Sequence, residues 1–175
     1  VRAAALASLL HSRNKVAITQ LPRLLNDPDV RVRRVAAEAA GTLLVNTAVR
    51  QLRTLAGDAD PVLASNSLKA LRQLKDGSAI TQALQALSLP EAQLEALSYL
   101  QEFGGLQHIS KLQPLAQNSR STDRIVGILR TLDHWWQRAQ TPTDKRKLAR
   151  AIAEMHNTSG TLIRWSVAGP VRLQA

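Results

Sequence analysis

The most chemically distinctive residues of the sequence are four neighbours, 133–136, which combine an acid, an imidazole and two indoles. Side chains of these types could line a pocket or stack on a nucleic-acid base. Helical spacing favours a structural role, because Trp136 follows Leu129 and Leu132 on one helix face. We therefore expect Trp136 to close the end of an apolar core and Trp135 to stay partly exposed.

Sequence patterns of the common catalytic and metal sites are missing. The four histidines lie far apart without Asp or Glu at ligand spacing, and the chain has no cysteine, so thiolate chemistry and Cys-ligated zinc or haem are excluded. Neither a Gly-rich phosphate loop nor a Gly-x-Ser-x-Gly nucleophile elbow occurs. Asp133 is the one candidate for a catalytic acid. We expect a protein that is not an enzyme and that carries no metal and no cofactor.

Positive charge is concentrated towards both ends of the chain. The formal net charge is +10, whereas residues 61–119 hold four basic and four acidic side chains. The basic runs at 31–34 and 145–150 could contact phosphates. Such runs are more often solvated helix faces, and the neutral middle argues against a continuous track for a nucleic acid. The charge therefore indicates anionic partners without deciding between them.

The elements that position these residues are predicted to be helices. Hydrophobic residues make up 45% of the chain and are mainly Leu and Ala, while aromatic residues make up 3%. This composition favours close-packed helices over a sheet. Residues 122–140 and 143–156 show apolar residues at helical spacing. No apolar run approaches the roughly 18 residues that span a bilayer, so we predict a soluble protein without membrane insertion, either cytoplasmic or periplasmic and exported.

Helical segments recur at a nearly constant interval. Four segments share one apolar spacing and begin at Ile18, Val49, Ile80 and Ile109. A second set of apolar positions keeps the same offsets, beginning at Val1, Val32 and Leu63. Asp and Pro stand between the two sets, where Asp can cap a helix and Pro can occupy its first turn. A fixed period of about 30 residues predicts stacked helical hairpins.

One unit resembles the HEAT-like repeats, especially the short form first associated with phycobilisome lyases. The resemblance rests on the sequence LPRLLNDP at 21–28, followed by VRRVAAEAAG at 32–41. It extends with decreasing clarity over about residues 1–140. It implies an all-α fold, a right-handed α-solenoid (α-α superhelix) of HEAT-like helical hairpins.

The resemblance also implies a structural role for two residues at the hairpin turns. HEAT-like families commonly tie adjacent repeats together with a ladder of Asp and Arg, which Asp27 and Arg33 would provide. Ala64 stands at the position of Arg33 in the next unit, so the ladder is expected to break there.

Two parts are expected along the chain. Residues 1–156 would form the HEAT-like solenoid, which begins inside a repeat, at a second helix, so further repeats of a larger parent protein are expected before it. Residues 157–175 are predicted to be a linker and a short extended C-terminal segment, strand-like and ended by a Gly-Pro turn. This segment could open a further domain.

The leading functional hypothesis is a protein-interaction scaffold module of a larger protein, because stacked hairpins make an extended surface and no catalytic residue set is visible. A protein partner would bind the concave face lined by the second helices, and other domains of the parent chain are further partners. The residues expected to contact the partner are Arg34, Lys69, Arg72, Gln101, Arg130 and Trp135. The alternative is a nucleic-acid-binding module that uses the basic residues of this groove. A third class, an enzyme similar to bilin lyases or helical-repeat DNA glycosylases, would need Asp133 beside a pocket.

Overall fold

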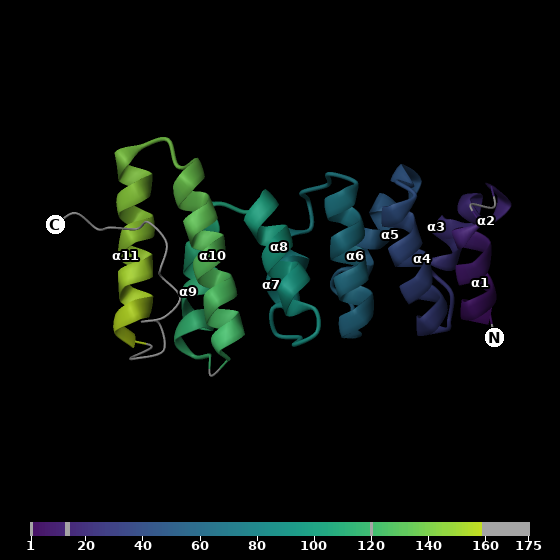
Figure 1. Ribbon diagram of the computed structural model, residues 1–175, viewed down its shortest axis with the longest axis horizontal. Helices are drawn as coiled ribbons and strands as arrows, with labels where there is room; N and C mark the ends of the chain where they lie inside the picture. The colour runs from purple at the N-terminus through teal and green to yellow at the C-terminus, as the bar shows by residue number, and fades with distance from the viewer. Residues whose placement is uncertain (1, 13–14, 120, 159–175) are drawn as a thin grey trace. The chain divides into compact units, whose positions relative to one another are not determined.

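The computed structural model consists of helices, turns and loops throughout the residues it describes, which are 2–12, 15–119 and 121–158 (Figure 1). The chain divides into two compact units, residues 1–103 and the residues from 104 onward. The described part of the chain contains eleven α-helices and no strand, so the predicted all-α class is confirmed.

The first unit contains a row of second helices that pack on one another. These helices are α1 (Arg2–His11), α4 (Val30–Thr42), α6 (Pro61–Gln73) and α8 (Gln93–Phe103). Each contacts the next one in this series, and Figure 1 shows them side by side. The row reproduces the second set of repeated apolar positions, because Val32 and Leu63 are buried at equivalent places in α4 and α6.

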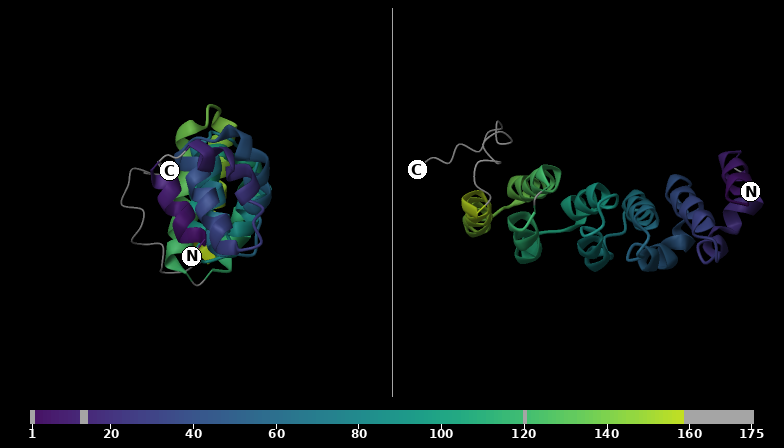
Figure 2. Two further views of the ribbon diagram at one scale, coloured as in Figure 1. Left: turned by 90° about the vertical axis from the view of Figure 1, so that its right-hand side faces the viewer. Right: turned by 90° about the horizontal axis from the view of Figure 1, so that it is seen from below.

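Shorter first helices form the other layer of this unit (Figure 2). They are α2 (Lys15–Thr19), α3 (Leu21–Leu24), α5 (Val49–Leu55), which follows the 3-10 turn η1 (Asn46–Ala48), and α7 (Ile80–Ala86). Each of α3, α5 and α7 packs against the second helix that follows it in the chain. The predicted starts at Val49 and Ile80 are confirmed as the first residues of α5 and α7. Hairpins that stack in this way form the predicted α-solenoid.

The first hairpin departs from the repeat pattern. The spacing predicts one helix from Ile18 onward, whereas the structure has two short helices that meet at Gln20. Pro22 accounts for the break, because it has no N–H to donate to the carbonyl of Ile18, which lies one helical turn earlier. Pro22 lies in the first turn of α3, where a missing donor does no harm.

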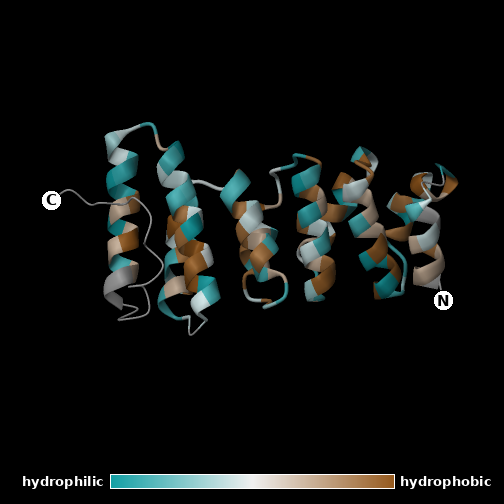
Figure 3. Cartoon of the chain, viewed as in Figure 1, coloured by the Kyte–Doolittle hydropathy of each residue, from teal (hydrophilic) through white to brown (hydrophobic). Residues whose placement is uncertain are grey.

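Small residues bring α4 and α6 close together. A Cβ atom built on Gly41 of α4 would lie 2.6 Å from the Cα and 2.8 Å from the Cβ of Ala70 on α6. These distances are far below the contact distance of two carbon atoms, so only glycine fits here. The apolar stretches of the helices, brown in Figure 3, alternate with polar ones, as expected for helices that bury one face.

Aspartates begin two of the second helices, as the sequence predicts. Asp29 caps α4 by accepting a hydrogen bond from the N–H of Arg31 (3.0 Å). Asp60 caps α6 by accepting one from the N–H of Leu63 (2.8 Å). Each cap satisfies a backbone donor that the helix itself leaves unpaired.

The C-terminal ends of α4 and α6 share an unusual backbone conformation. Leu44 and Lys75 adopt φ angles of 53° and 58°, in the left-handed region that L-residues rarely populate. The N–H of Leu44 donates to the carbonyl of Gly41 (3.1 Å) and the N–H of Val45 to that of Ala40 (2.9 Å), which is a Schellman motif. The same hydrogen bonds recur around Lys75, so two successive repeats end their second helix with the same C-terminal cap.

The second unit contains a short first helix and two long helices. Its elements are η2 (Leu106–His108), α9 (Ile109–Gln117), α10 (Thr122–Arg138) and α11 (Pro142–Thr158). The predicted helix start at Ile109 is confirmed. The two long helices predicted at 122–140 and 143–156 are present with slightly different ends. α11 packs against α9 and α10, and Leu112, Ile128, Leu132, Leu148 and Met155 are fully or almost fully buried.

Trp135 is the tryptophan that fills the core of this unit, so the prediction that Trp136 would do so was wrong. Trp135 is 3% exposed, whereas Trp136 is half-buried. The ring of Trp135 lies against His108, with 6.4 Å between the ring centroids. The buried face of α10 runs through Ile128, Leu132 and Trp135 at helical spacing, one helical step away from the face that the sequence suggested.

The predicted extended segment at the C-terminal end lies outside the described residues. Helix α11 continues to Thr158, slightly beyond the predicted end of the solenoid at residue 156. The linker and the strand-like tail of 157–175 therefore stay predictions from residue 159 onward.

Candidate partner-binding face

The second helices of the first unit present one continuous set of solvent-accessible side chains. On α6, positions 62, 65, 69 and 72 recur at helical spacing and therefore lie on one side of the helix. All four are at least partly exposed. Together with the equivalent residues of α4, of α8 and of the turn before α8, they define the second-helix face. Its members are Arg31, Arg34, Glu38, Val62, Ser65, Lys69, Arg72, Glu91, Leu94, Ser98 and Gln101.

Four of the six predicted contact residues lie on this face. Arg34 belongs to α4, Lys69 and Arg72 to α6, and Gln101 to α8. The other two belong to the second unit, where Arg130 is exposed on α10 and Trp135 is buried. Trp135 is 3% exposed and lies against His108, so the structure does not favour its predicted role as a contact residue.

Arg34 is engaged in the packing of two helices. Its Nε donates to Oδ1 of Asp60 (2.9 Å), and its Nη2 donates to the other carboxylate oxygen. The side-chain amide of Asn66 donates to the backbone carbonyl of Arg34 (3.1 Å). The hydrogen bond from Arg34 holds the pKa of Asp60 below its usual range. Arg34 therefore links α4 to α6 and offers a partner only part of its charge.

Arg72 forms a second link, between α6 and α8. Its Nε lies 3.0 Å from Oε1 of Glu95. Burial raises the pKa of Glu95, although the positive charges of Arg72 and Lys69 oppose that shift. Lys69 itself is exposed and has no hydrogen-bond or ion-pair partner within the described part of the chain. It is the cation of this face that is available to a partner.

Two apolar side chains on this face were not foreseen from the sequence. Leu94 is 70% exposed and Val62 is 38% exposed. They lie near the N-terminal ends of the neighbouring helices α8 and α6. The signal was present in the repeat alignment, because Leu94 occupies the position that polar Ser65 holds in the preceding repeat. Exposed apolar groups beside charged ones are typical of protein-binding surfaces.

The turn residues behave as the family resemblance implies. Arg33 Nη1 donates to the backbone carbonyls of Asp27 (2.9 Å) and Pro28 (3.2 Å). Its Nη2 lies 4.0 Å from a carboxylate oxygen of Asp58, which is the equivalent of Asp27 in the next repeat. Ala64, at the position of Arg33 in that repeat, is buried. The ladder therefore joins one pair of turns and ends there.

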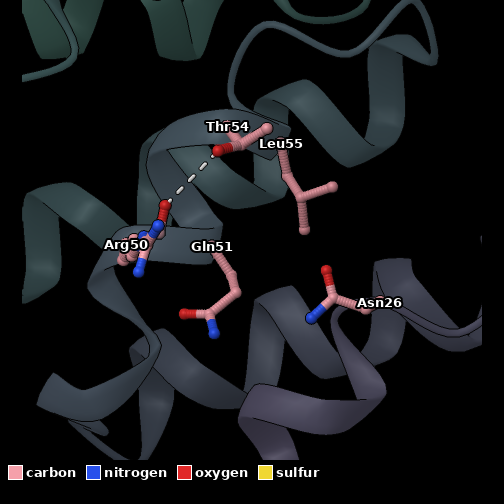
Figure 4. A pocket seen from close by; sticks show the side chains of 5 residues that line it. All are labelled: Asn26, Arg50, Gln51, Thr54 and Leu55. Carbon is pink, nitrogen blue, oxygen red and sulfur yellow. Dashed lines mark hydrogen bonds between the residues drawn. The ribbon is translucent and has the colours of Figure 1, made fainter.

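A shallow depression lies on the first-helix side of this unit. It has a volume of about 290 Å³ and is lined by Asn26, Arg50, Gln51, Thr54 and Leu55 (Figure 4). A second depression of about 230 Å³ lies at the turns around residues 56–59 and 85–89. Both are smaller than typical small-molecule pockets. Within the described ranges, no three His, Asp or Glu side chains are grouped so that they could hold a metal ion.

None of the described helices has the length and apolar character needed to cross a membrane.

Residues 21–91, from the start of α3 to the turn before α8, match the family model for HEAT repeats. No curated protein matches the chain. The narrower resemblance to the phycobilisome-lyase form of these repeats stays a prediction.

Proposed function

We propose that the first unit, whose residues 21–91 match the family model for HEAT repeats, is a protein-interaction scaffold that binds a partner protein on its second-helix face. HEAT repeats generally act as scaffolds for protein–protein interaction, because stacked hairpins offer an extended surface of side chains. The partner would contact Lys69, Arg72 and Gln101 as predicted, together with the two apolar residues Val62 and Leu94.

The exposure of Leu94 carries this proposal. A leucine that is 70% exposed contributes little to folding, whereas its burial under a partner would contribute about 1.5–3 kcal/mol to binding. Val62 on the adjacent helix is a second exposed apolar side chain of the same face, and Lys69 lies on the same side of α6. A partner that fits this surface would bring an apolar side chain to Val62 and Leu94 and a carboxylate to Lys69.

The charges of this face support a protein partner over a nucleic acid. The guanidinium groups of Arg34 and Arg72 already face Asp60 and Glu95. Such pairing reduces the number of counterions that a bound phosphate backbone would release, and that release drives most non-specific binding to nucleic acids.

Site-specific cross-linking tests the proposal. A photo-reactive amino acid at position 94 should form a cross-link to a partner protein in cell extract, whereas the same group at Thr81, an exposed residue of α7, should not. The partner identified in this way is then purified. Leu94→Asp should weaken its binding about tenfold or more, and Thr81→Asp, which adds the same charge on the other layer, should not.

Equal cross-linking at positions 94 and 81 would contradict the proposal. So would a purified partner whose affinity does not change with Leu94→Asp.

A further inference from the structure

The second unit carries positive charge that its own acids do not balance. Residues 104–158 contain nine Lys and Arg against four Asp and Glu, whereas residues 1–103 contain twelve against nine. Within the described part of the first unit, six of these cations form ion pairs with carboxylates. This imbalance is independent of the function proposed for the second-helix face.

Three of the cations of the second unit form a cluster on α11. Lys145, Arg146 and Lys147 are consecutive and exposed, and none of the three side chains has a hydrogen-bond or ion-pair partner within the described part of the chain. The nearest acid in the sequence, Asp144, exchanges hydrogen bonds with Thr141. The hydroxyl of Thr141 donates to the carboxylate (2.7 Å) and accepts from the N–H of Asp144 (3.1 Å).

Stability does not explain this cluster. The three residues directly follow the first turn of α11, where cations gain nothing from the helix dipole. The buried side of α11 carries Leu148, Ala151 and Met155, so the cationic side chains are not needed to cover the core. Exposed cations that neither cover the core nor pair with an acid are available to bind an anion.

The surroundings of the cluster indicate which anion it fits. The large apolar side chains that are exposed in the described chain are Val16, Leu44, Val62 and Leu94, all in the first unit. The cluster therefore lacks the apolar neighbours with which a peripheral helix enters a membrane. Of the two tryptophans of α10, Trp135 is buried and Trp136 is half-buried, and the cluster itself contains no aromatic residue that could stack on an unpaired base. What remains is attraction to phosphate groups by charge alone.

The geometry of three consecutive helical residues favours a duplex. Successive side chains are about 100° apart around a helix, so the three cations spread over about 200° of its surface. The major groove of B-form DNA admits an α-helix and has phosphates along both walls, whereas the major groove of double-stranded RNA is too narrow. We propose that the second unit binds the phosphate backbone of double-stranded DNA, without sequence preference, through Lys145, Arg146 and Lys147.

Fluorescence anisotropy with the full chain tests this proposal. Two labelled duplexes of about 20 base pairs and unrelated sequence should bind with equal affinity, as expected for contacts to phosphates alone. The logarithm of the binding constant should fall with the logarithm of salt concentration, and the cluster should contribute about −3 to that slope. The K145Q/R146Q/K147Q variant should weaken binding about tenfold or more at low salt and lose that contribution.

A matched variant controls for net charge. Lys15, Arg23 and Arg50 of the first unit are also exposed, and K15Q/R23Q/R50Q removes the same three charges. It should leave DNA affinity within about twofold of the wild type. The charge-preserving K145R/K147R variant should bind like the wild type. The single R146Q variant should lower the salt slope by about one. These two variants keep the test informative if the triple variant loses helix content.

Three outcomes would overturn the proposal. The wild type could fail to bind the duplexes, the two triple variants could lose affinity equally, or polyglutamate and anionic phosphatidylserine vesicles could bind as tightly as DNA. The second outcome would mean that only net charge matters, and the third that another polyanion is the ligand.

Discussion

Asp60 holds the guanidinium of Arg34 on one helix and the first turn of its own helix at the same time. Its Oδ1 atom accepts hydrogen bonds both from Nε of Arg34 (2.9 Å) and from the N–H of Leu63 (2.8 Å). The carboxylate is 17% exposed. One side chain therefore caps α6 and joins it to α4, which makes the two helices dependent on each other.

Replacing Asp60 should cost more stability than replacing Arg34. Asp60→Ala removes a helix cap, which costs about 1 kcal/mol, and leaves Arg34 without its acid, which costs about 1–2 kcal/mol more. Arg34→Gln leaves the cap intact and should lower the free energy of unfolding by about 1 kcal/mol. Urea denaturation measures both values. Asp29→Ala is the control, because Asp29 caps α4 and pairs with Arg31, whose side chain is 73% exposed.

Acid should destabilise the first unit through Asp60 and Asp76. Hydrogen bonds from Arg34 and Arg53 lower the pKa values of these two groups in the folded chain, whereas an unfolded aspartate has a pKa of about 3.9. Between the folded and unfolded pKa values the unfolded chain binds more protons, so the free energy of unfolding rises with pH. The stabilisation should be complete above about pH 5 and lost as the pH falls through the folded values.

Denaturation curves at several pH values between about 3 and 7 check this prediction. The D60N/D76N variant should show a smaller loss of stability on acidification than the wild type. Glu95 acts with the opposite sign, because burial raises its pKa, and its contribution is lost as the pH rises above the ordinary glutamate value. Glu95→Gln should therefore leave the acid-induced loss in place. An equal loss in the wild type and in D60N/D76N would contradict the assignment.

Gly41→Ala should destabilise the protein although alanine is the better helix former. The exchange gains up to about 1 kcal/mol of helix propensity, but the new Cβ would lie 2.6 Å from the Cα of Ala70. Separating α4 from α6 to relieve this contact should cost more than the gain, giving a net loss of about 1–3 kcal/mol. Thermal and urea unfolding measure it. An Ala39→Gly variant in the half-buried part of the same helix shows the propensity effect alone.

Leu44→Gly and Lys75→Gly should stabilise the protein. Both residues hold left-handed φ angles that glycine adopts without strain, and the gain is partly offset by the greater freedom of glycine in the unfolded chain. We expect a gain of about 0.5–1 kcal/mol for Leu44→Gly. Lys75→Gly should gain less, because it removes the 2.8 Å ion pair with Glu102, an exposed contact of small value. A loss of stability in Leu44→Gly would show that its side chain contributes packing.

Tyr99→Phe should weaken the link between α8 and the loop before α7. The buried hydroxyl of Tyr99 donates to the carbonyl of Asp76 (2.6 Å) and accepts from the N–H of Ala79 (3.0 Å). Removing it leaves two backbone groups unpaired, at a cost of about 1–3 kcal/mol. The aromatic contact with Phe103 would remain. Phe103→Leu, which keeps the hydroxyl and loses the ring contact, is the matched comparison in urea denaturation.

The repeat period of about 30 residues predicted the stacked hairpins well, because the spacing of the apolar residues decides which side of each helix is buried. The first residues of α5, α7 and α9 fall on Val49, Ile80 and Ile109 as expected. The break at Gln20 was missed, because the apolar spacing continues through Pro22 while the backbone hydrogen bonds do not.

The sequence could not decide whether Trp135 or Trp136 is buried. Both continue an apolar series through Leu132, and the interval from Leu132 to either of them fits one turn of a helix. Contact with His108, which precedes α9 and lies far from Trp135 in the chain, decides which ring is buried. A single helix cannot reveal such a contact.

The candidate face was only partly predictable for a similar reason. Helical spacing grouped Arg34, Lys69 and Arg72 on the second helices, but it could not show that two of them pair with acids at the start of the next second helix. Ion pairs of this kind depend on how neighbouring repeats stack. Leu94 was overlooked, because leucine in a helix is normally assigned to the core.

The location of the aromatic residues gives each unit its own spectroscopic reporter. All three tryptophans follow residue 104, and the one tyrosine, Tyr99, is buried in the first unit. Tryptophan emission therefore reports no residue of the first unit, while circular dichroism follows the helices of both. If the midpoints of the two signals differ during denaturation, the halves of the chain melt as separate cooperative blocks.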